Sequence, residues 1–167
     1  MYINRKANKI QQLLKHDRRI FRTSDLAVLW EIQNKNTLLT TIKRYIKRKI
    51  LVRIKKGVYS TVPLEKLEAY ELGCALAGPL SYVSTETVLA QQGVISQVPR
   101  KITLMGKKAG SWVVEGNEYW CRYLAPKHLV DRVGIVETTR YAVATPPRAK
   151  KDLRRVNPHV YLEKEGK

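Results

Sequence analysis

Apolar residues recur with the period of an α-helix in three stretches of the first fifty residues. The first stretch covers residues 3–16 and places its isoleucines and leucines on one face, which predicts a scaffold helix. The second stretch has its apolar positions at Leu26, Leu29 and Trp30. It is preceded by Thr23 and Ser24, and either side chain can cap a helix N-terminus. The chain is therefore predicted to begin with two amphipathic helices.

The third stretch begins at residues 34–37, where Asn34 or Asn36 can cap a helix. Its apolar positions between Leu38 and Ile46 define a face that we expect to be buried. The rest of the helix surface is polar and basic. The residues that we expect on this exposed surface are Lys35, Thr37, Thr40, Thr41, Lys43, Arg44 and Lys47.

A hairpin is predicted directly after the third helix. From Ile50 apolar and basic residues alternate as far as Lys56, and Val58 begins a returning apolar run. Gly57 is expected to supply the positive φ of the tight turn, with Lys55 and Lys56 beside it at the tip. Three helices followed by a basic hairpin predict a winged helix-turn-helix domain.

Pro63 ends this unit, and the composition then changes. Residues 64–77 alternate apolar and acidic positions at helical spacing, which predicts one helix whose acidity contrasts with the basic first third. We therefore expect a winged helix-turn-helix domain at residues 1–62 and a second domain at residues 64–167.

The second domain is predicted to be a small mixed sheet with helices. A strand at residues 80–84 precedes a helix at residues 85–93, which Ser84 or Thr85 can cap and Gly93 can end. Three strand-like runs follow. They cover residues 101–105, 111–115 and 118–124, with a turn at 116–117 between the last two. The fold class expected for the chain is therefore α+β.

The net charge of +18 is unevenly distributed. Residues 1–60 carry 16 of the 32 Lys and Arg residues and only three acids, a net charge of +13. A concentrated positive field accelerates association with a polyanion and releases counterions on binding, which indicates nucleic acid. An anionic membrane is the rival partner, but its usual ligand is one long basic helix, whereas these cations are divided between a helix and a hairpin. We therefore expect double-stranded DNA as the partner and no membrane.

The third helix and the hairpin are the candidate DNA interface. Asn, Thr, Lys and Arg in the first half of a recognition helix can reach base edges, and those further along meet phosphates. The alternative is a charged helix beside a two-stranded edge, with its lysines merely solvated. The candidate DNA-binding residues are Lys35, Asn36, Thr37, Thr40, Thr41, Lys43, Arg44, Lys47, Lys55, Lys56 and Gly57.

Four segments of this chain resemble the AbiEi antitoxin family of type IV toxin–antitoxin systems, whose members are often described as transcriptional regulators of viral defence. The segments are residues 21–26, 53–59, 82–93 and 144–146, and the resemblance runs over nearly the whole chain. It implies a winged helix that binds inverted repeats in the promoter of its own operon. It also implies a second domain that counteracts a neighbouring nucleotidyltransferase toxin without forming a stable complex with it.

The chain departs from this family after Pro146. Family members continue with an acidic residue and an apolar helix, whereas residues 147–155 here are polar and basic. A stand-alone DNA-binding regulator, or a protein-interaction module, without antitoxin activity is therefore the alternative. The cations Lys150, Lys151, Arg154 and Arg155 either form a second DNA contact or belong to a solvated tail.

An enzymatic function is not expected. The three histidines lie in unrelated contexts, and the chain has no nucleophile motif, no Gly-rich phosphate loop and no metal-ligand spacing. Glu115, Glu118 and Asp131 could suggest a nuclease, but they lack the compact carboxylate-x-Lys spacing that such metal sites need. We expect no catalytic residues, no metal and no cofactor.

Two further patterns bear on location and on interactions. The N-terminus has no apolar signal region, and no segment approaches the ~18 apolar residues of a membrane span, so a cytoplasmic protein is expected. Cys74 and Cys121 are therefore expected to be reduced, buried thiols. Five aromatic residues, four of them in the predicted strands, are expected in the core. The alternative is that they anchor a protein partner or stack on bases. The aromatic residues concerned are Trp30, Trp112, Tyr119, Trp120 and Tyr123.

Overall fold

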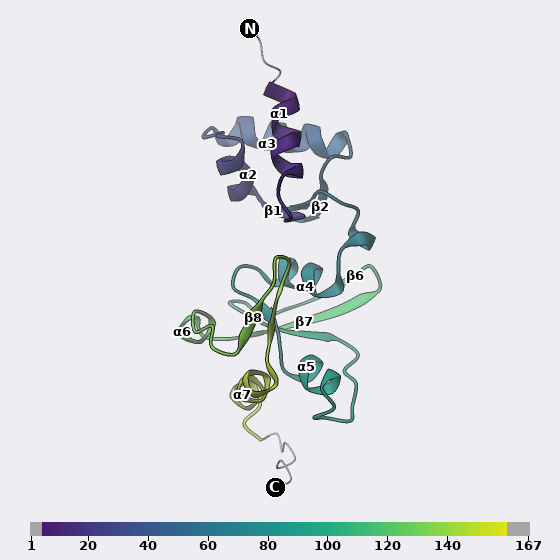
Figure 1. The fold of residues 1–167 in the computed structure, drawn as a ribbon, viewed down its shortest axis with the longest axis vertical. Helices are drawn as coiled ribbons and strands as arrows, with labels where there is room; N and C mark the ends of the chain where they lie inside the picture. Colours follow the sequence, from purple (N-terminus) through teal and green to yellow (C-terminus); the bar gives the residue numbers. More distant parts are fainter. Residues whose placement is uncertain (1–4, 160–167) are drawn as a thin grey trace. The chain divides into compact units, whose positions relative to one another are not determined.

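The computed structural model describes residues 5–159, with side chains from residue 9 onward. Within those residues it contains seven α-helices, one short 3₁₀ helix and two β-sheets, which confirms the predicted mixture of helices and strands. The chain divides into two compact units, Met1–Leu67 and Glu68–Lys167, named here the first and second unit (Figure 1). Residues 64–67, expected at the start of the second domain, lie in the first unit.

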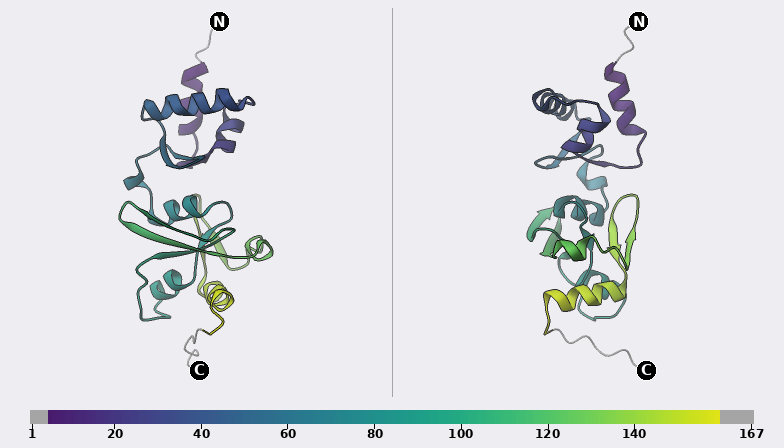
Figure 2. Two further views of the ribbon diagram at one scale, coloured as in Figure 1. Left: turned by 180° about the vertical axis from the view of Figure 1, so that it is seen from behind. Right: turned by 90° about the vertical axis from the view of Figure 1, so that its left-hand side faces the viewer.

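The first unit consists of short helices and a small sheet. Its elements are α1 (Arg5–Leu14), β1 (Ile20–Arg22), α2 (Thr23–Leu29), α3 (Lys35–Lys47), β2 (Val52–Lys55), β3 (Val58–Ser60) and the 3₁₀ helix η1 (Leu64–Lys66). The strands are ordered β1-β3-β2, and both pairs are antiparallel. The three helices gather beside this sheet (Figure 2).

The predicted apolar faces of the three helices supply the core of the first unit. Leu26 and Trp30 of the α2 segment are buried, whereas Leu29 is only partly buried. The rings of Trp30 and Tyr45 lie with their centroids 5.2 Å apart, which joins α2 to α3. The buried residues of this core are Leu13, Phe21, Leu26, Trp30, Leu38, Ile42, Tyr45, Leu51 and Tyr59.

Two features of the first unit differ from expectation. Phe21 lies in a strand, β1, that pairs with β3 opposite Tyr59. The strand has only three residues, so its alternation is too short to recognise in the sequence. Neither Thr23 nor Ser24 caps α2, because Arg22 occupies the cap position and its backbone N–H donates to the Asp25 carboxylate at 2.8 Å.

The second unit has helices on both faces of a six-stranded sheet. Its elements are α4 (Ala69–Ala77), β4 (Tyr82–Val83), α5 (Glu86–Gln91), β5 (Ile102–Gly106), β6 (Gly110–Val114), β7 (Asn117–Tyr123), α6 (Pro126–Leu129), β8 (Ile135–Glu137), β9 (Ala142–Ala144) and α7 (Pro146–Val156). The strand order is β6-β7-β5-β4-β9-β8, in which β4/β9 and β5/β7 are parallel.

Figures 1 and 2 show α4 on one face of this sheet and α5 and α7 on the other. α4 approaches the sheet closely at Gly73, where an added Cβ would lie only 3.0 Å from the ring of Tyr119. The three predicted runs of strand are confirmed as β5, β6 and β7. The turn between β6 and β7 is one residue earlier than predicted, since Glu115 and Gly116 have the positive φ angles, 49° and 74°.

Three predictions for the second unit need correction. The single helix expected over residues 64–77 is broken, because Leu67 is extended with ψ 142° and α4 begins only at Ala69. The expected strand at residues 80–84 is reduced to β4. Residues 146–156 form α7 with Ala149 and Leu153 buried, so they are not a solvated tail.

Candidate nucleic-acid interface

Helix α3 has one buried and one exposed face. Asn34 caps the helix through its side-chain oxygen, which accepts from the backbone N–H of Thr37 at 3.0 Å. Leu38, Ile42 and Tyr45 are buried in the core of the first unit. The side chains on the opposite face follow one another at intervals of three or four positions. These exposed residues are Asn36, Thr40, Lys43 and Lys47.

Thr41 does not belong to the exposed face, and the prediction that it does is wrong. Its side chain is 3% exposed, and its hydroxyl donates to the carbonyl of Thr37 at 2.8 Å. The position lies three residues after Leu38 and four before Tyr45, which places it beside the buried stripe. Thr41 therefore supports the helix and is not available to a base edge.

The remaining candidates on α3 flank the exposed face. Lys35, Thr37 and Arg44 are all exposed. The Thr37 hydroxyl donates to Asn34 Oδ1 at 3.2 Å, so it takes part in the helix cap. Arg44 keeps a long side chain on the outer surface in the last turns of the helix.

The hairpin β2–β3 carries the second group of candidates. Gly57 has φ 78°, which fits the positive φ expected of it, and its carbonyl accepts from the backbone N–H of Thr23 at 3.0 Å. Lys56 is exposed, whereas Lys55 is half-buried. Arg53 of β2 is also exposed. The sequence interpretation missed Arg53 as a candidate, although the alternation of basic and apolar residues along β2 contains the signal.

α3 and the hairpin carry cations without any acidic residue. α3 contains Lys35, Lys43, Arg44 and Lys47 and no acidic residue. Asp25, one of three acids in residues 1–60, forms an ion pair with Arg18 at 2.5 Å. A surface of this kind attracts phosphate groups, and its polar Asn and Thr side chains can hydrogen-bond to base edges.

The second unit contains a buried polar cluster around Asp152 of α7. The carboxylate accepts from the Tyr82 hydroxyl at 2.8 Å, from the Ser84 hydroxyl at 2.9 Å and from Arg148 Nε at 3.1 Å. Arg148 also donates to the carbonyls of Asp131, Val133 and His128. Burial and the neighbouring Asp152 carboxylate raise the pKa of Tyr82. Because these groups bind one another inside the unit, the cluster fixes α7 to the sheet.

The carboxylates weighed for a nuclease are not gathered into a metal site. Glu118 forms an ion pair with Arg100 at 2.8 Å, and Asp131 accepts from the backbone N–H of Val133. Glu115 lies in the turn between β6 and β7. Over residues 5–159 we find no group of three or more His, Cys, Asp or Glu residues that could hold a metal ion.

The cysteines and aromatic residues differ in their degree of burial. Cys74 and Cys121 are free thiols, and burial raises the pKa of Cys74 to about 11. Tyr119 is buried as expected. Trp120 and Tyr123 are 40% and 56% exposed, so the prediction that they belong to the core is wrong for these two.

Comparisons with known proteins give no identification. No protein-family model matches the chain, and no curated protein matches its sequence. In the part of the chain that the structure describes, every helix is too short or too polar to cross a membrane.

Proposed function

We propose that the first unit is a winged helix-turn-helix domain that binds double-stranded DNA with α3 in the major groove and the β2–β3 hairpin as a wing. The order α1-β1-α2-α3-β2-β3, with the strands arranged β1-β3-β2, supports this assignment. The observation that carries it is the acid-free exposed face of α3. The hairpin follows α3 directly and presents further cations, Arg53 and Lys56.

The two ends of the exposed face of α3 are suited to different parts of DNA. Asn36 and Thr40 are short polar side chains in the first half of the helix, where a recognition helix meets base edges. Lys43 and Lys47 lie further along and reach phosphate oxygens. Arg44 can make a bidentate contact with a guanine, the commonest specific contact in the major groove. This division gives α3 both affinity and sequence preference.

We further propose that this DNA binding represses transcription of the operon that encodes the protein, at inverted repeats in its promoter. The resemblance of four segments to AbiEi antitoxins supports this role. Two of the four, residues 21–26 and 53–59, coincide with β1–α2 and with the hairpin.

Selection of duplexes from a random pool by the full-length protein tests DNA reading. We expect enrichment of one sequence motif, arranged as inverted repeats, and its presence upstream of the gene. Recovery of duplexes without any common motif would contradict sequence-specific reading, and binding would then be purely electrostatic.

The proposed role of the second unit is to counteract a nucleotidyltransferase toxin without a stable complex. The resemblance supports this role: it implies a helix at the point where α7 begins, although α7 is basic and the implied helix is apolar. Co-expression of the full chain with a nucleotidyltransferase encoded next to it tests the role through colony counts. Protection should persist when Lys43, Arg44 and Lys47 are replaced by Ala. Absence of protection, or of such a gene, favours a stand-alone regulator.

A further inference from the structure

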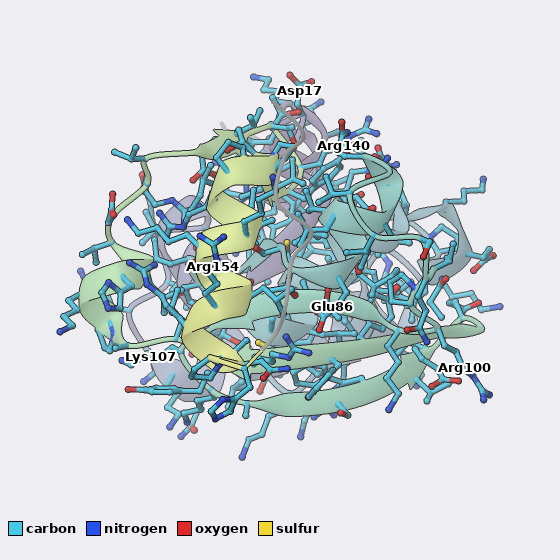
Figure 3. All side chains as sticks on the ribbon, turned by 90° about the horizontal axis from the view of Figure 1, so that it is seen from below. Asp17, Glu86, Arg100, Lys107, Arg140 and Arg154 are labelled. Carbon is cyan, nitrogen blue, oxygen red and sulfur yellow. The ribbon has the colours of Figure 1, made fainter. Side chains whose placement is uncertain are left out.

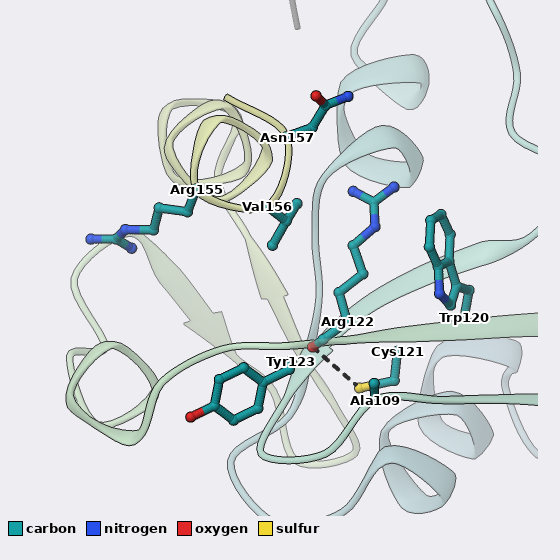
Figure 4. A pocket seen from close by; sticks show the side chains of 8 residues that line it. All are labelled: Ala109, Trp120, Cys121, Arg122, Tyr123, Arg155, Val156 and Asn157. Atoms are coloured by element: carbon teal, nitrogen blue, oxygen red, sulfur yellow. Dashed lines mark hydrogen bonds between the residues drawn. The ribbon is translucent and has the colours of Figure 1, made fainter. Parts of the chain in front are cut away.

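The second unit has a pocket between the end of β7 and the last turn of α7. Its volume is about 510 Å³, within the range of small-molecule sites. Figure 4 shows the side chains that line it. The lining residues that matter here are Trp120, Arg122, Tyr123, Arg155, Val156 and Asn157. We infer that this pocket binds one nucleotide, either free or as an unpaired nucleotide of a strand.

Exposed aromatic rings supply the surface for a base. Trp120 and Tyr123 are large side chains that remain 40% and 56% exposed although both belong to a strand of the sheet. The guanidinium of Arg122 lies 4.0 Å from the centroid of the Trp120 ring and donates to Glu86 at 2.5 Å. These contacts hold Arg122 and Trp120 in place as a planar surface. Nucleic-acid bases stack on aromatic rings and guanidinium planes of this kind.

Cations close to the pocket supply the contact with phosphate. Arg155 lines the pocket, and Lys151 and Arg154 are exposed on the same helix, where Figure 3 shows Arg154 projecting from α7. Burial lowers the pKa of His128, and the nearby cations Arg155, Lys127 and Lys151 lower it further. The cations around His128 make this region electropositive, and such a region attracts a phosphate group.

Backbone strain and unused polar atoms occur at Thr85 and Glu86, and Glu86 is the ion-pair partner of Arg122. Thr85 is fully buried with φ 54° and ψ −129°, a conformation that a β-branched residue rarely adopts. Among the described residues, three neighbouring side-chain atoms are buried without a hydrogen-bond partner. They are Thr85 Oγ1, Glu86 Oε2 and Arg122 Nη1. Strain and unsatisfied polar groups are costly, and their concentration beside a pocket is typical of a functional site.

Asn157 completes the chemistry of the pocket. Its amide can both donate and accept hydrogen bonds, as the edge of a base requires. The charge of Arg122 is offset by Glu86, and that of Arg155 is shared with the buried Asp152 at 3.3 Å. The phosphate contact therefore combines Arg155 with the exposed Lys151 and Arg154 of the same helix. This site is separate from the proposed duplex-reading face of α3, and it does not depend on that proposal.

Titration of the full-length protein with adenosine monophosphate and, separately, with a single-stranded thymidine decamer tests the inference by calorimetry. Two variants remove the proposed contacts, Trp120→Ala for the base and Arg155→Gln for the phosphate. The Gln amide can still donate to Asp152, the partner of Arg155. The matched control is Arg100→Gln, which removes a cation whose side chain is 87% exposed outside the pocket. Thermal unfolding checks that each variant is folded.

We expect Trp120→Ala to weaken nucleotide binding by about tenfold or more, as loss of a stacked base does, and Arg155→Gln to weaken it severalfold. The control should bind as the wild type does. Binding of the monophosphate identifies a free nucleotide, whereas variant-sensitive binding of the decamer alone identifies a strand. The inference is overturned if neither probe binds. It is also overturned if both folded variants bind as strongly as the control.

Discussion

Helices α3 and α7 are both strongly basic, but only α7 places a cation in its buried stripe. The cations of α3 all lie on its exposed side, while its buried stripe is wholly free of charged residues. In α7 the buried stripe itself contains Arg148 and Asp152, which bind each other and Tyr82. The position of a cation relative to the apolar stripe therefore decides whether it stabilises the fold or remains available to a partner.

This comparison predicts its largest effect at Arg148. Replacement of Arg148 by Ala leaves the Asp152 carboxylate buried without its main partner, and we expect unfolding of the second unit to become about 3–5 kcal/mol easier. Denaturant unfolding followed by circular dichroism measures this change. The control on the same helix is Arg154→Ala, which removes an exposed guanidinium and should change the free energy of unfolding by less than about 0.5 kcal/mol. Similar effects of the two replacements would refute the distinction.

The next largest effect is expected on α3, where replacement of a cation should change binding rather than folding. Arg44→Ala should cost about 1–3 kcal/mol on the preferred duplex and reduce the preference for it, because a bidentate contact discriminates between bases. Lys47→Ala should weaken binding to every duplex alike, because phosphates carry no sequence information. Competition assays with preferred and random duplexes measure both. Equal losses on the two duplexes for both variants would show that α3 does not read the bases.

The two threonines in the middle of α3 sharpen the comparison within a single helix. Thr41→Val removes the hydrogen bond to the Thr37 carbonyl, so it should destabilise the first unit by about 1 kcal/mol and leave DNA preference unchanged. Thr40→Ala should alter DNA preference and leave stability within about 0.5 kcal/mol of the wild type. Thermal unfolding and duplex competition provide the two measurements. The reverse pattern would mean that Thr41, not Thr40, faces DNA.

The smallest effect is expected at the hairpin. Replacing Arg53 and Lys56 together by Ala should lower the slope of log affinity against log salt by about 1.8, since each phosphate contact contributes about 0.9. The control replaces Lys15 and Lys66, two exposed cations outside α3 and the hairpin, and should leave the slope unchanged. An unaltered slope in the hairpin variant would remove the wing from the DNA interface.

The sequence predicted those elements whose apolar pattern is long enough to show a period. Helix α3 and strand β7 are examples: α3 repeats its apolar positions over several turns, and β7 alternates the buried Tyr119 and Cys121 with Trp120 and Arg122. Strand β1 and the break at Leu67 after the 3₁₀ helix η1 were missed. β1 and η1 each have three residues, too few to show a period, and the conformation of such segments depends on residues distant in the chain. Tertiary pairing decides such segments.

The exposed face of α3 was predictable in most of its residues and not in its details. A helical period identifies the exposed face of α3 but leaves positions at the edge of the stripe ambiguous, and Thr41 is one of these. The burial of Arg148 could not be foreseen, because its partner Tyr82 lies in β4, more than sixty positions earlier in the chain.

Equilibrium binding of the full-length protein to a selected duplex and to its scrambled counterpart, measured over a range of salt concentrations, tests the reading of DNA by α3 most directly. The variant to compare with the wild type replaces Asn36, Thr40 and Arg44 by Ala and keeps the lysines. We predict that the wild type prefers the selected duplex and that the variant binds both duplexes alike. The slope of log affinity against log salt for the variant should stay close to that of the wild type, apart from the one contact that Arg44 can contribute. Retention of the full preference by the folded variant would contradict the assignment of α3 as the recognition helix.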